Sequence, residues 1–400
     1  MTRVLLDLSR LVSRVRHATP SGVDRVEMAY ARGLERAYGN DLVFAAVHPA
    51  GLYGHLDRAA ALDYLDMLEA RWSAGDGTAE QRSIVSVLPW MARLRPVMRS
   101  RLATSDPSIY VQVSPHHLTR PATVRHKLAY ENARFLCMVH DLIPIEYPEY
   151  ARPEGAAQHE RRMETLAHHA DALIFNSAAT MQSFAAWATI AGRQIAGHVA
   201  LLGTEALPLA EPFVADDGRP HFICVSTIEG RKNHLLLLNL WRQLAATLPT
   251  DQIPRLVIVG RRGWENEQVL DMLDRCAPLR DHVTEVNACS DQHLAALLRG
   301  ARALLMPSFA EGYGMPVAEA LSVGVPVICS DIPAHREVGS AVPEYIDPLD
   351  GPGWRAAILD HAQKGALWQA QARRLTQWHQ PTWDDHMAVV QTAVAALADR

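Results

Sequence analysis

The chain has 400 residues, 48% hydrophobic and 21% charged, and its 39 Lys and Arg against 44 Asp and Glu give a formal net charge of −5. This is the composition of a globular protein, and it excludes collagenous, low-complexity and disordered classes. The mild acidity also excludes a global basic field for nucleic acid, although a local basic patch can still bind an anionic surface.

In chain order, short apolar runs predict strands at residues 4–8, 42–47, 109–113, 135–139, 172–175 and 198–202, and a second series at 222–225, 256–259, 283–286, 303–306 and 326–329. Helical periodicity lies between many of them, for example at 23–37, 160–170, 234–246 and 291–298. Short buried strands alternating with helices predict an α/β fold with parallel sheets covered on both faces.

The pattern restarts once, after a Pro-, Gly- and acid-rich run at 203–220, GTEALPLAEPFVADDGRP. We therefore expect an N-terminal Rossmann-like domain at 1–203, a linker at 204–220 and a C-terminal Rossmann-like domain at 221–380. Ligands of such domains bind at the carboxyl ends of the strands, so we expect the two domains to face a common cleft.

The cysteines and the N-terminus indicate the compartment. Five cysteines are scattered without a C-x-x-C pair or a Cys/His cluster, which argues against a disulfide framework and a zinc site. The first residues, MTRVLLDLSRLVSRV, are interrupted by charges, and no run of about 18 apolar residues occurs. We expect a cytoplasmic protein that is neither secreted nor membrane-spanning.

A basic stretch at 81–105 has five arginines and no acid, interleaved with apolar residues that include Trp90. Basic residues beside Trp and Leu are typical of a helix that lies on anionic lipid, although Pro89 and Pro96 interrupt a long helix. The alternative is an ordinary solvated face with buried apolar side chains. The lipid alternative predicts peripheral contact of residues 82–102 with the inner face of the cytoplasmic membrane.

The densest chemical signal is SFAEGYGMPVAE at 308–319, which follows a predicted strand and opens a helix near Met315. Its glycines allow positive φ and close backbone approach, and the helix start offers N–H groups to an anionic ligand. Glu311 and Glu319 are suited to gripping the vicinal hydroxyls of a sugar or ribose. The alternative is a solvated strand-to-helix turn with incidental glutamates.

A second signal is VSTIEGRKNH at 225–234, again a strand followed by a glycine and a helix. Arg231 and Lys232 stand at the start of that helix, where cations oppose the macrodipole but are well placed to bind a diphosphate. The alternative is a pair of exposed basic residues on a loop.

The N-terminal half carries two weaker signals. His140 follows the predicted strand at 135–139, where it could donate a hydrogen bond to a substrate hydroxyl or stabilise charge, and Asp141 caps the next turn. The alternative is a hydrogen-bonded histidine on a buried loop. Gly22 precedes a helix, where backbone could approach a phosphate.

Several motifs are absent. There is no G-x-G-x-x-G after the first strand, no G-x-x-x-x-G-K-[ST] and no D-x-D, and the histidines lack metal-ligand spacing. We expect no cofactor and no metal, so that a phosphate charge would be met by Arg, Lys and helix ends.

Together these motifs resemble a known family. The blocks at 140–150, 161–180, 225–234, 257–264 and 307–338 resemble those of retaining glycosyltransferases of family 4, whose two Rossmann-like domains form the GT-B fold. The last block, PSFAEGYGMPVAEALSVGVPVICSDIPAHREV, is the most specific, and the resemblance covers nearly the whole chain. It also implies that the segment 381–400 is a helix that crosses back to the N-terminal domain.

The resemblance implies roles for individual residues. Glu311 would lie close to the donor sugar and Glu319 would hold the ribose, while Arg231 and Lys232 would neutralise the donor diphosphate. His140 would lie near the reacting sugar. The remaining donor-binding positions implied are Gly314, Met315, Pro316, Gly22 and Thr227, although VDRVE after Gly22 departs from the family's aromatic-containing version.

The implied function is transfer of a sugar, with retention, from a nucleotide-diphosphate sugar to a saccharide hydroxyl, in assembly of a bacterial surface polysaccharide such as capsule or lipopolysaccharide. The acceptor class expected is a lipid-linked or growing saccharide. Two alternatives stay open: a sugar-nucleotide epimerase of similar fold, and a non-catalytic protein that binds sugar nucleotides.

Overall fold

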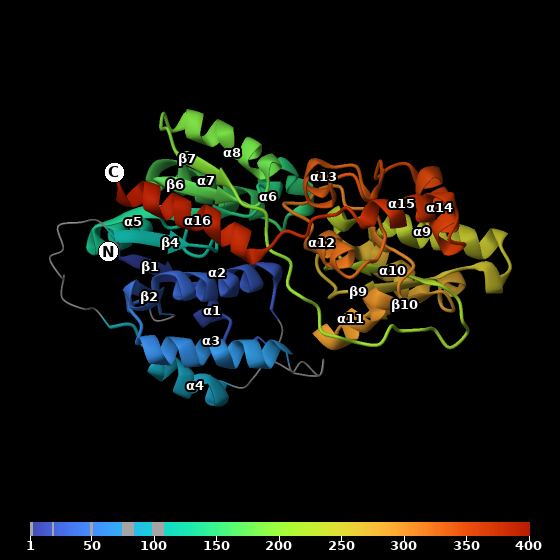
Figure 1. The fold of residues 1–400 in the computed structure, drawn as a ribbon, viewed down its shortest axis with the longest axis horizontal. Helices are drawn as coiled ribbons and strands as arrows, with labels where there is room; N and C mark the ends of the chain where they lie inside the picture. Colours follow the sequence, from blue (N-terminus) through green and yellow to red (C-terminus); the bar gives the residue numbers. More distant parts are fainter. Residues whose placement is uncertain (1–2, 18–19, 49–50, 74–83, 98–107) are drawn as a thin grey trace. The chain divides into compact units, whose positions relative to one another are not determined.

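The computed structural model describes residues 3–17, 20–48, 51–73, 84–97 and 108–400 (Figure 1). The chain forms two compact units, each described by itself here. Unit 1 comprises 1–145, 154–203 and 382–400, and unit 2 comprises 146–153 and 204–381.

Unit 1 contains a seven-stranded sheet in the order β3-β2-β1-β4-β5-β6-β7. All its neighbouring strands are parallel except β2 and β3. Strands β1, β4 and β6 are buried along their whole length, as expected of a sheet covered on both faces. The strands are β1 (Val4–Asp7), β2 (Leu42–Val47), β3 (Tyr53–His55), β4 (Ser108–Gln112), β5 (Ala133–Val139), β6 (Ala172–Phe175) and β7 (Ala196–Val199).

The helices of unit 1 connect these strands and include the C-terminal helix of the chain. They are α1 (Ser9–Ser13), α2 (Gly22–Tyr38), α3 (Arg58–Ser73), α4 (Ile84–Arg93), α5 (Pro121–Glu131), α6 (Ile143–Glu146, which ends in unit 2), α7 (Gly155–His169), α8 (Ala178–Ile190) and α16 (Trp383–Ala398). His386 on α16 makes buried hydrogen bonds with the Leu201 carbonyl, at 3.0 Å, and with the Tyr30 hydroxyl, at 2.8 Å. These bonds fasten α16 to unit 1.

Unit 2 contains a six-stranded, wholly parallel sheet in the order β10-β9-β8-β11-β12-β13. The strands are β8 (His221–Val225), β9 (Arg255–Val259), β10 (Val283–Val286), β11 (Leu304–Met306), β12 (Val327–Ser330) and β13 (Glu344–Ile346). The helices are α9 (His234–Thr247), α10 (Glu267–Arg275), α11 (Asp291–Gly300), α12 (Met315–Ser322), α13 (Pro333–Gly339), α14 (Gly351–Ala362) and α15 (Ala366–Leu375).

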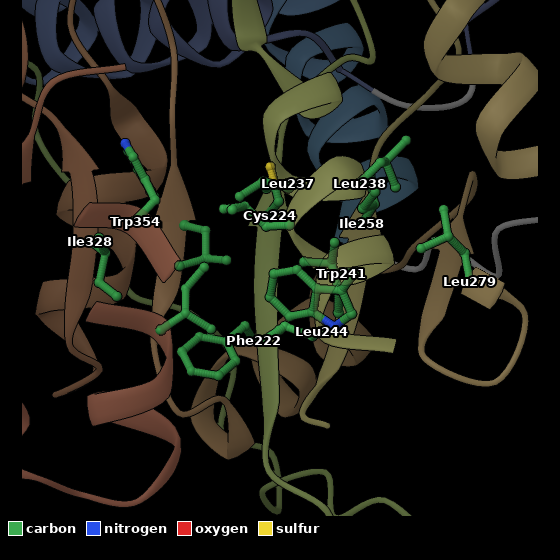
Figure 2. Packing of buried hydrophobic residues seen from close by; sticks show 14 of the residues in the cluster. Phe222, Cys224, Leu237, Leu238, Trp241, Leu244, Ile258, Leu279, Ile328 and Trp354 are labelled. Atoms are coloured by element: carbon green, nitrogen blue, oxygen red, sulfur yellow. The ribbon is translucent and has the colours of Figure 1, made fainter. Parts of the chain in front are cut away.

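The core of unit 2 is built around large aromatic side chains that α9 and α14 pack onto the sheet (Figure 2). Trp241 and Trp354 are both fully buried, and the Phe222 and Trp241 rings meet edge to face with centroids 6.1 Å apart. Each indole N–H has a carbonyl partner, Pro254 for Trp241 and Asp347 for Trp354. Both indole N–H groups therefore have hydrogen-bond partners while the rings supply apolar area.

The predicted strands and helices are confirmed to within a few residues, but two strands were not predicted. β3 (YGH) and β13 (EYI) have three residues each and neither is an apolar run, whereas the equally short β11 (LLM) is one. The segment 204–220 contains no helix or strand, as expected of a linker, and its contacts place it in unit 2. Residues 146–153, by contrast, belong to unit 2 although they lie within the stretch expected to form the N-terminal domain.

The basic stretch proposed for lipid contact lies partly outside the described residues. Within its described part, the Trp90 ring packs against Tyr64 of α3 with centroids 5.6 Å apart, and Leu94 is buried. Arg93 pairs with Asp63 of α3 at 2.6 Å. Trp90 and Arg93 therefore both contact α3. No helix in the described part of the chain is long and apolar enough to cross a membrane.

Candidate functional site

The strand order of unit 2 marks where a ligand would bind. The chain winds outward from β8 through β9 to β10, then returns to β11 beside β8 and winds the other way. In open parallel sheets, ligands bind outside the carboxyl ends of the strands at such a reversal point. The loops that follow β8 and β11 both leave the sheet there, and they carry the two strongest sequence motifs.

Local backbone conformation turns both loops sharply. After β8 a short 3-10 helix, η3 (Gly230–Lys232), leads into α9 through Asn233, whose φ of 55° lies in the left-handed region. After β11 the loop ends at Gly314, whose φ of 102° suits glycine and which caps the start of α12. The helix expected to begin near Met315 begins at that residue, which confirms the prediction.

These turns bring Arg231, Lys232 and Glu311 together. Lys232 Nζ donates to Glu311 Oε1 at 2.5 Å, and Arg231 Nη1 donates to Glu311 Oε2 at 2.9 Å. The Ser308 hydroxyl donates to the same Oε1 at 2.7 Å, and Arg231 Nε pairs with the buried Glu229 at 2.7 Å. We call Glu229, Arg231, Lys232, Ser308 and Glu311 the switch-point cluster.

Electrostatics keeps the cluster ionised despite its burial. Burial opposes ionisation of Glu311, but the nearby Lys232 and Arg231 outweigh it and hold the pKa of that carboxyl well below its usual range. Burial lowers the pKa of Lys232, and the Glu311 carboxylate opposes that shift. The two cations are balanced by two carboxylates, so the four charged groups sum to zero.

Gly314, Met315, Pro316 and Glu319 all lie at or on the first turns of α12, whose loop also carries Glu311. The ring of His335, on α13, closes the space behind Gly314: a Cβ built on this glycine would lie 3.0 Å from His335 Cδ2. His335 is fully buried, and its Nδ1 lies 3.0 Å from the Ser330 carbonyl oxygen. Burial lowers the pKa of His335, so the ring is neutral and Nδ1 donates to that carbonyl.

Two of the expected site residues, His140 and Gly22, lie in unit 1. His140 follows β5, and its Nε2 lies 2.7 Å from the Val113 carbonyl oxygen. Burial lowers the pKa of His140, so the ring is neutral at neutral pH. Its one N–H is on Nε2, which donates a hydrogen bond to that carbonyl. Nδ1 is then an acceptor, whereas the sequence suggested a histidine that donates to a substrate hydroxyl.

Gly22 is the first residue of α2. Ser21 caps the helix and forms a capping box with Asp24. Arg10 and Arg14 both donate to the buried Asp24 carboxylate, at 2.7 and 3.2 Å. The helix start in unit 1 is therefore fixed by two arginines that the sequence reading did not single out.

Thr227 is exposed on the loop after β8, and a Cβ built on Gly263 would lie 2.8 Å from its methyl carbon. It is not part of the switch-point cluster. Among the described residues, no group of three or more His, Cys, Asp or Glu side chains could hold a metal ion.

Three contributors to the site were missed by the sequence reading: Ser308, Glu229 and His335. Ser308 and Glu229 stand inside the two quoted motifs, three and two residues before their partners, so spacing alone could have suggested them. His335 lies more than twenty positions after Glu311 and is brought to Gly314 only by packing of α13 on α12.

Two α/β units, each built on a largely parallel sheet whose strand order reverses once, define a class by fold, the GT-B fold. Solved structures of that fold match over the full chain. Sucrose-phosphate synthase of Thermosynechococcus elongatus has a TM-score of 0.64 at 16% identity and covers 99% of each chain. Anabaena HepE, solved with UDP and glucose, has a TM-score of 0.63 at 15% identity and covers 99% of this chain and 100% of that one.

Sequence comparison then gives the family. Residues 209–341 match the family of group 1 glycosyl transferases. The serotype-specific mannosyltransferase WbdA of Escherichia coli is 29% identical over 225 residues, 51% of this chain and 27% of WbdA. The O-antigen chain mannosyltransferase B of Escherichia coli is 32% identical over 184 residues, 45% of this chain and 47% of that protein. Residues 209–341 therefore match a group 1 glycosyl transferase domain, and the chain's matches span between about a quarter and a half of these curated relatives.

Proposed function

We propose that the chain transfers a hexose from a nucleotide-diphosphate sugar to a hydroxyl of a saccharide acceptor, with retention of anomeric configuration. The observation that carries the proposal is the switch-point cluster, in which two cations and a carboxylate from two separated motifs meet at the reversal point of a group 1 domain. The similarity to a serotype-specific mannosyltransferase and to an O-antigen chain mannosyltransferase supports mannose as the transferred sugar and a bacterial surface polysaccharide as the product.

In this mechanism the leaving diphosphate carries the developing negative charge. Arg231 and Lys232 stabilise that charge, and such preorganised groups are typically worth about 3 kcal/mol each in a site that excludes water. The N-terminal end of α12 adds a positive partial charge. The leaving phosphate oxygen takes the proton of the acceptor hydroxyl, because retention places both on one face of the sugar. No metal is required in this scheme.

Glu311 then has two tasks. Before the donor binds, its carboxylate balances the two cations, which lowers the cost of burying them. With donor present, the diphosphate competes for the cations and the carboxylate is available to accept hydrogen bonds from sugar hydroxyls. Glu319, one turn further along α12, is proposed to hold the ribose. We place Gly314, Met315 and Pro316 beneath the sugar and Thr227 at the edge of the donor.

We propose that His140 and Gly22, both in unit 1, also take part in substrate binding. In a neutral His140, Nε2–H donates to the Val113 carbonyl oxygen, which leaves Nδ1 as a hydrogen-bond acceptor. Nδ1 can then orient a sugar hydroxyl by accepting a hydrogen bond from it. Gly22 stands where the start of α2 would approach a phosphate. The acceptor is proposed to be a lipid-linked or growing saccharide, and this does not depend on the basic stretch at 82–102, whose Trp90 packs on α3.

The test is a thermal-shift panel of nucleotides and nucleotide sugars, followed by NMR of the mixture with and without saccharide acceptors. A ligand that binds only the folded protein raises its melting temperature by mass action. The proposal expects stabilisation by one class of nucleoside diphosphate and a new α-linked product that needs an acceptor. Epimerisation of the nucleotide sugar without acceptor would contradict sugar transfer and favour the epimerase. Binding of a nucleotide sugar with no product would favour the non-catalytic protein.

A further inference from the structure

A short segment from the first half of the sequence belongs to unit 2. Residues 146–153, between α6 and α7 (Figure 1), have their contacts there, while the residues before and after them belong to unit 1. The segment contains the 3-10 helix η2 (Pro148–Tyr150).

The backbone of this segment is anchored on the loop that follows β9. The indole N–H of Trp264 donates to the Tyr150 carbonyl oxygen at 3.0 Å. The guanidinium carbon of Arg152 lies 4.4 Å from the centroid of the Trp264 ring, within the range of a cation–π contact. Trp264 therefore contacts the segment at two residues, Tyr150 and Arg152.

The Tyr150 ring contacts both loops that build the switch-point cluster. It stacks on Phe309 with centroids 5.8 Å apart and planes 3° from parallel. A Cβ built on Gly230 would lie 3.3 Å from Tyr150 Cδ1, so the ring also lies against the backbone at the start of η3. Gly230 directly precedes the two cations, and Phe309 stands two residues before Glu311.

Those two loops are joined to each other at the same place. The Phe309 N–H donates to the Arg231 carbonyl oxygen at 2.8 Å, and Arg231 Nη1 donates to the Ala310 carbonyl oxygen at 2.9 Å. The flat face of Tyr150 therefore covers a junction whose geometry sets the distance between Arg231, Lys232 and Glu311. Groups that act on developing charge must be held to within about half an ångström, which needs packing around them.

We propose that Tyr150 is a positioning residue of the donor site: its ring braces the Gly230 and Phe309 backbones so that the cations and Glu311 keep the geometry that receives the diphosphate. The inference rests on the proposed function, because it assigns donor binding to the switch-point cluster. Tyr150 itself acts through these loops.

The segment offers a matched control in Tyr147. This tyrosine lies three residues earlier and stacks on Tyr150 with centroids 6.1 Å apart. It is 37% exposed, and its aromatic contact is with Tyr150 rather than with Phe309. Removing its ring deletes a similar apolar area from the same segment without uncovering the junction.

The experiment compares Tyr150→Ala, Tyr150→Phe and Tyr147→Ala, with donor affinity measured by calorimetry, kcat and KM by transfer, and the melting temperature of each variant. We expect Tyr150→Ala to weaken donor binding by about fivefold or more, the scale of one aromatic pair, and to lower kcat, with KM for the acceptor unchanged. Tyr150→Phe keeps the stack and should retain wild-type donor affinity, as should Tyr147→Ala.

Equal donor affinity in Tyr150→Ala and Tyr147→Ala would overturn the inference, as would a loss in Tyr150→Phe as large as in Tyr150→Ala. Where Tyr150→Ala does not fold, Phe309→Leu removes the same stack from the other side and must give the same loss. Lys232→Ala separates the two levels. If it weakens donor binding while Tyr150→Ala does not, only the bracing role fails; if neither does, the proposed donor site fails.

Discussion

Glu311 is the residue on which the charge balance of unit 2 depends. Its side chain is 6% exposed and receives three hydrogen bonds, two of them from cations. Removing one partner of a buried ion pair leaves the others without compensation, and this costs more than the pair contributes as a whole. The consequence can be measured as stability, independently of any substrate.

We predict that Glu311→Gln lowers the free energy of unfolding by about 3 kcal/mol at pH 7. Because the fold lowers the pKa of Glu311, the stabilisation is complete above the ordinary glutamate pKa of about 4.3 and is lost as the pH falls toward the lower pKa of the folded state. Urea unfolding at pH 7 and near pH 3 should therefore show a difference that shrinks in acid.

Asp274→Asn is the matched control, since it breaks an exposed carboxylate–arginine pair with Arg262 in the same unit. It should cost much less than Glu311→Gln at pH 7, because solvent screens exposed pairs. Equal losses in the two variants, or a Glu311→Gln loss that persists unchanged at pH 3, would contradict the charge balance described for the cluster.

Glu27 of α2 shows the opposite shift. It is fully buried, receives the Leu11 N–H at 3.4 Å, and its second carboxyl oxygen has no hydrogen-bond partner among the described residues. Burial, together with the nearby Asp7 carboxylate, raises the pKa of Glu27 to about 8, while Arg10 and Ser114 oppose the shift. Asp7 is itself held ionised by Lys127 at 2.7 Å. Glu27 is therefore a neutral acid at pH 7.

We predict that Glu27→Gln, which replaces a neutral acid by a neutral amide, becomes progressively more stable than the wild type as the pH rises. The unfolded carboxyl ionises above about pH 4.3 and the folded one only near 8, so the wild type loses up to about 1.4 kcal/mol per pH unit between them. Unfolding free energies measured from pH 5 to 9 check this. A difference between the two proteins that does not change with pH would refute a protonated Glu27.

Among the secondary-structure elements, α12 determines the shape of the candidate donor loop. Both of its ends carry a glycine with positive φ, Gly314 at 102° and Gly324 at 80°. The two differ in surroundings: a Cβ on Gly314 would meet the His335 ring at 3.0 Å, whereas a Cβ on Gly324 would meet no heavy atom within 4 Å. A methyl group added at the first end would therefore meet a neighbouring side chain, and one added at the second would not.

We predict that Gly324→Ala costs about 1 kcal/mol of stability through backbone strain alone and leaves donor affinity unchanged. Gly314→Ala should cost more, because the methyl group also displaces His335, and should weaken nucleotide-sugar binding. Chemical unfolding and calorimetry on both variants give the comparison. Donor affinity that falls equally in the two variants would mean that the loop does not depend on the His335 contact.

At this scale the sequence predicted most of the fold. Buried parallel strands such as β8 and β12 are continuous apolar runs. The glycine at the start of α12 indicates a backbone with positive φ. β3 and β13 were missed because YGH and EYI are short and are not apolar runs, unlike the equally short β11. The Gly314–His335 contact was missed because the two residues lie on separate helices, and the sequence does not state how those helices pack.

For the whole molecule, the net charge of −5 does not show how positive and negative side chains are grouped. The switch-point cluster is neutral in sum, although it holds a buried lysine and a half-buried arginine. The chain also passes between the two units at four places, after Ile145, Pro153, Gly203 and Pro381. The sequence predicted the passages near 203 and 381 from composition and resemblance. It did not predict the excursion of 146–153, because nothing in YPEYARP distinguishes a loop of one unit from a segment docked on the other.

In the proposed reaction, Arg231 and Lys232 stabilise the leaving diphosphate of a nucleotide sugar. The decisive measurement is sugar transfer by Lys232→Ala, as kcat/KM with the donor found in the thermal-shift panel. Loss of this cation should lower the rate at least about tenfold, the factor that corresponds to 1.36 kcal/mol of transition-state stabilisation. A variant that folds and transfers within about threefold of the wild type would contradict the claim.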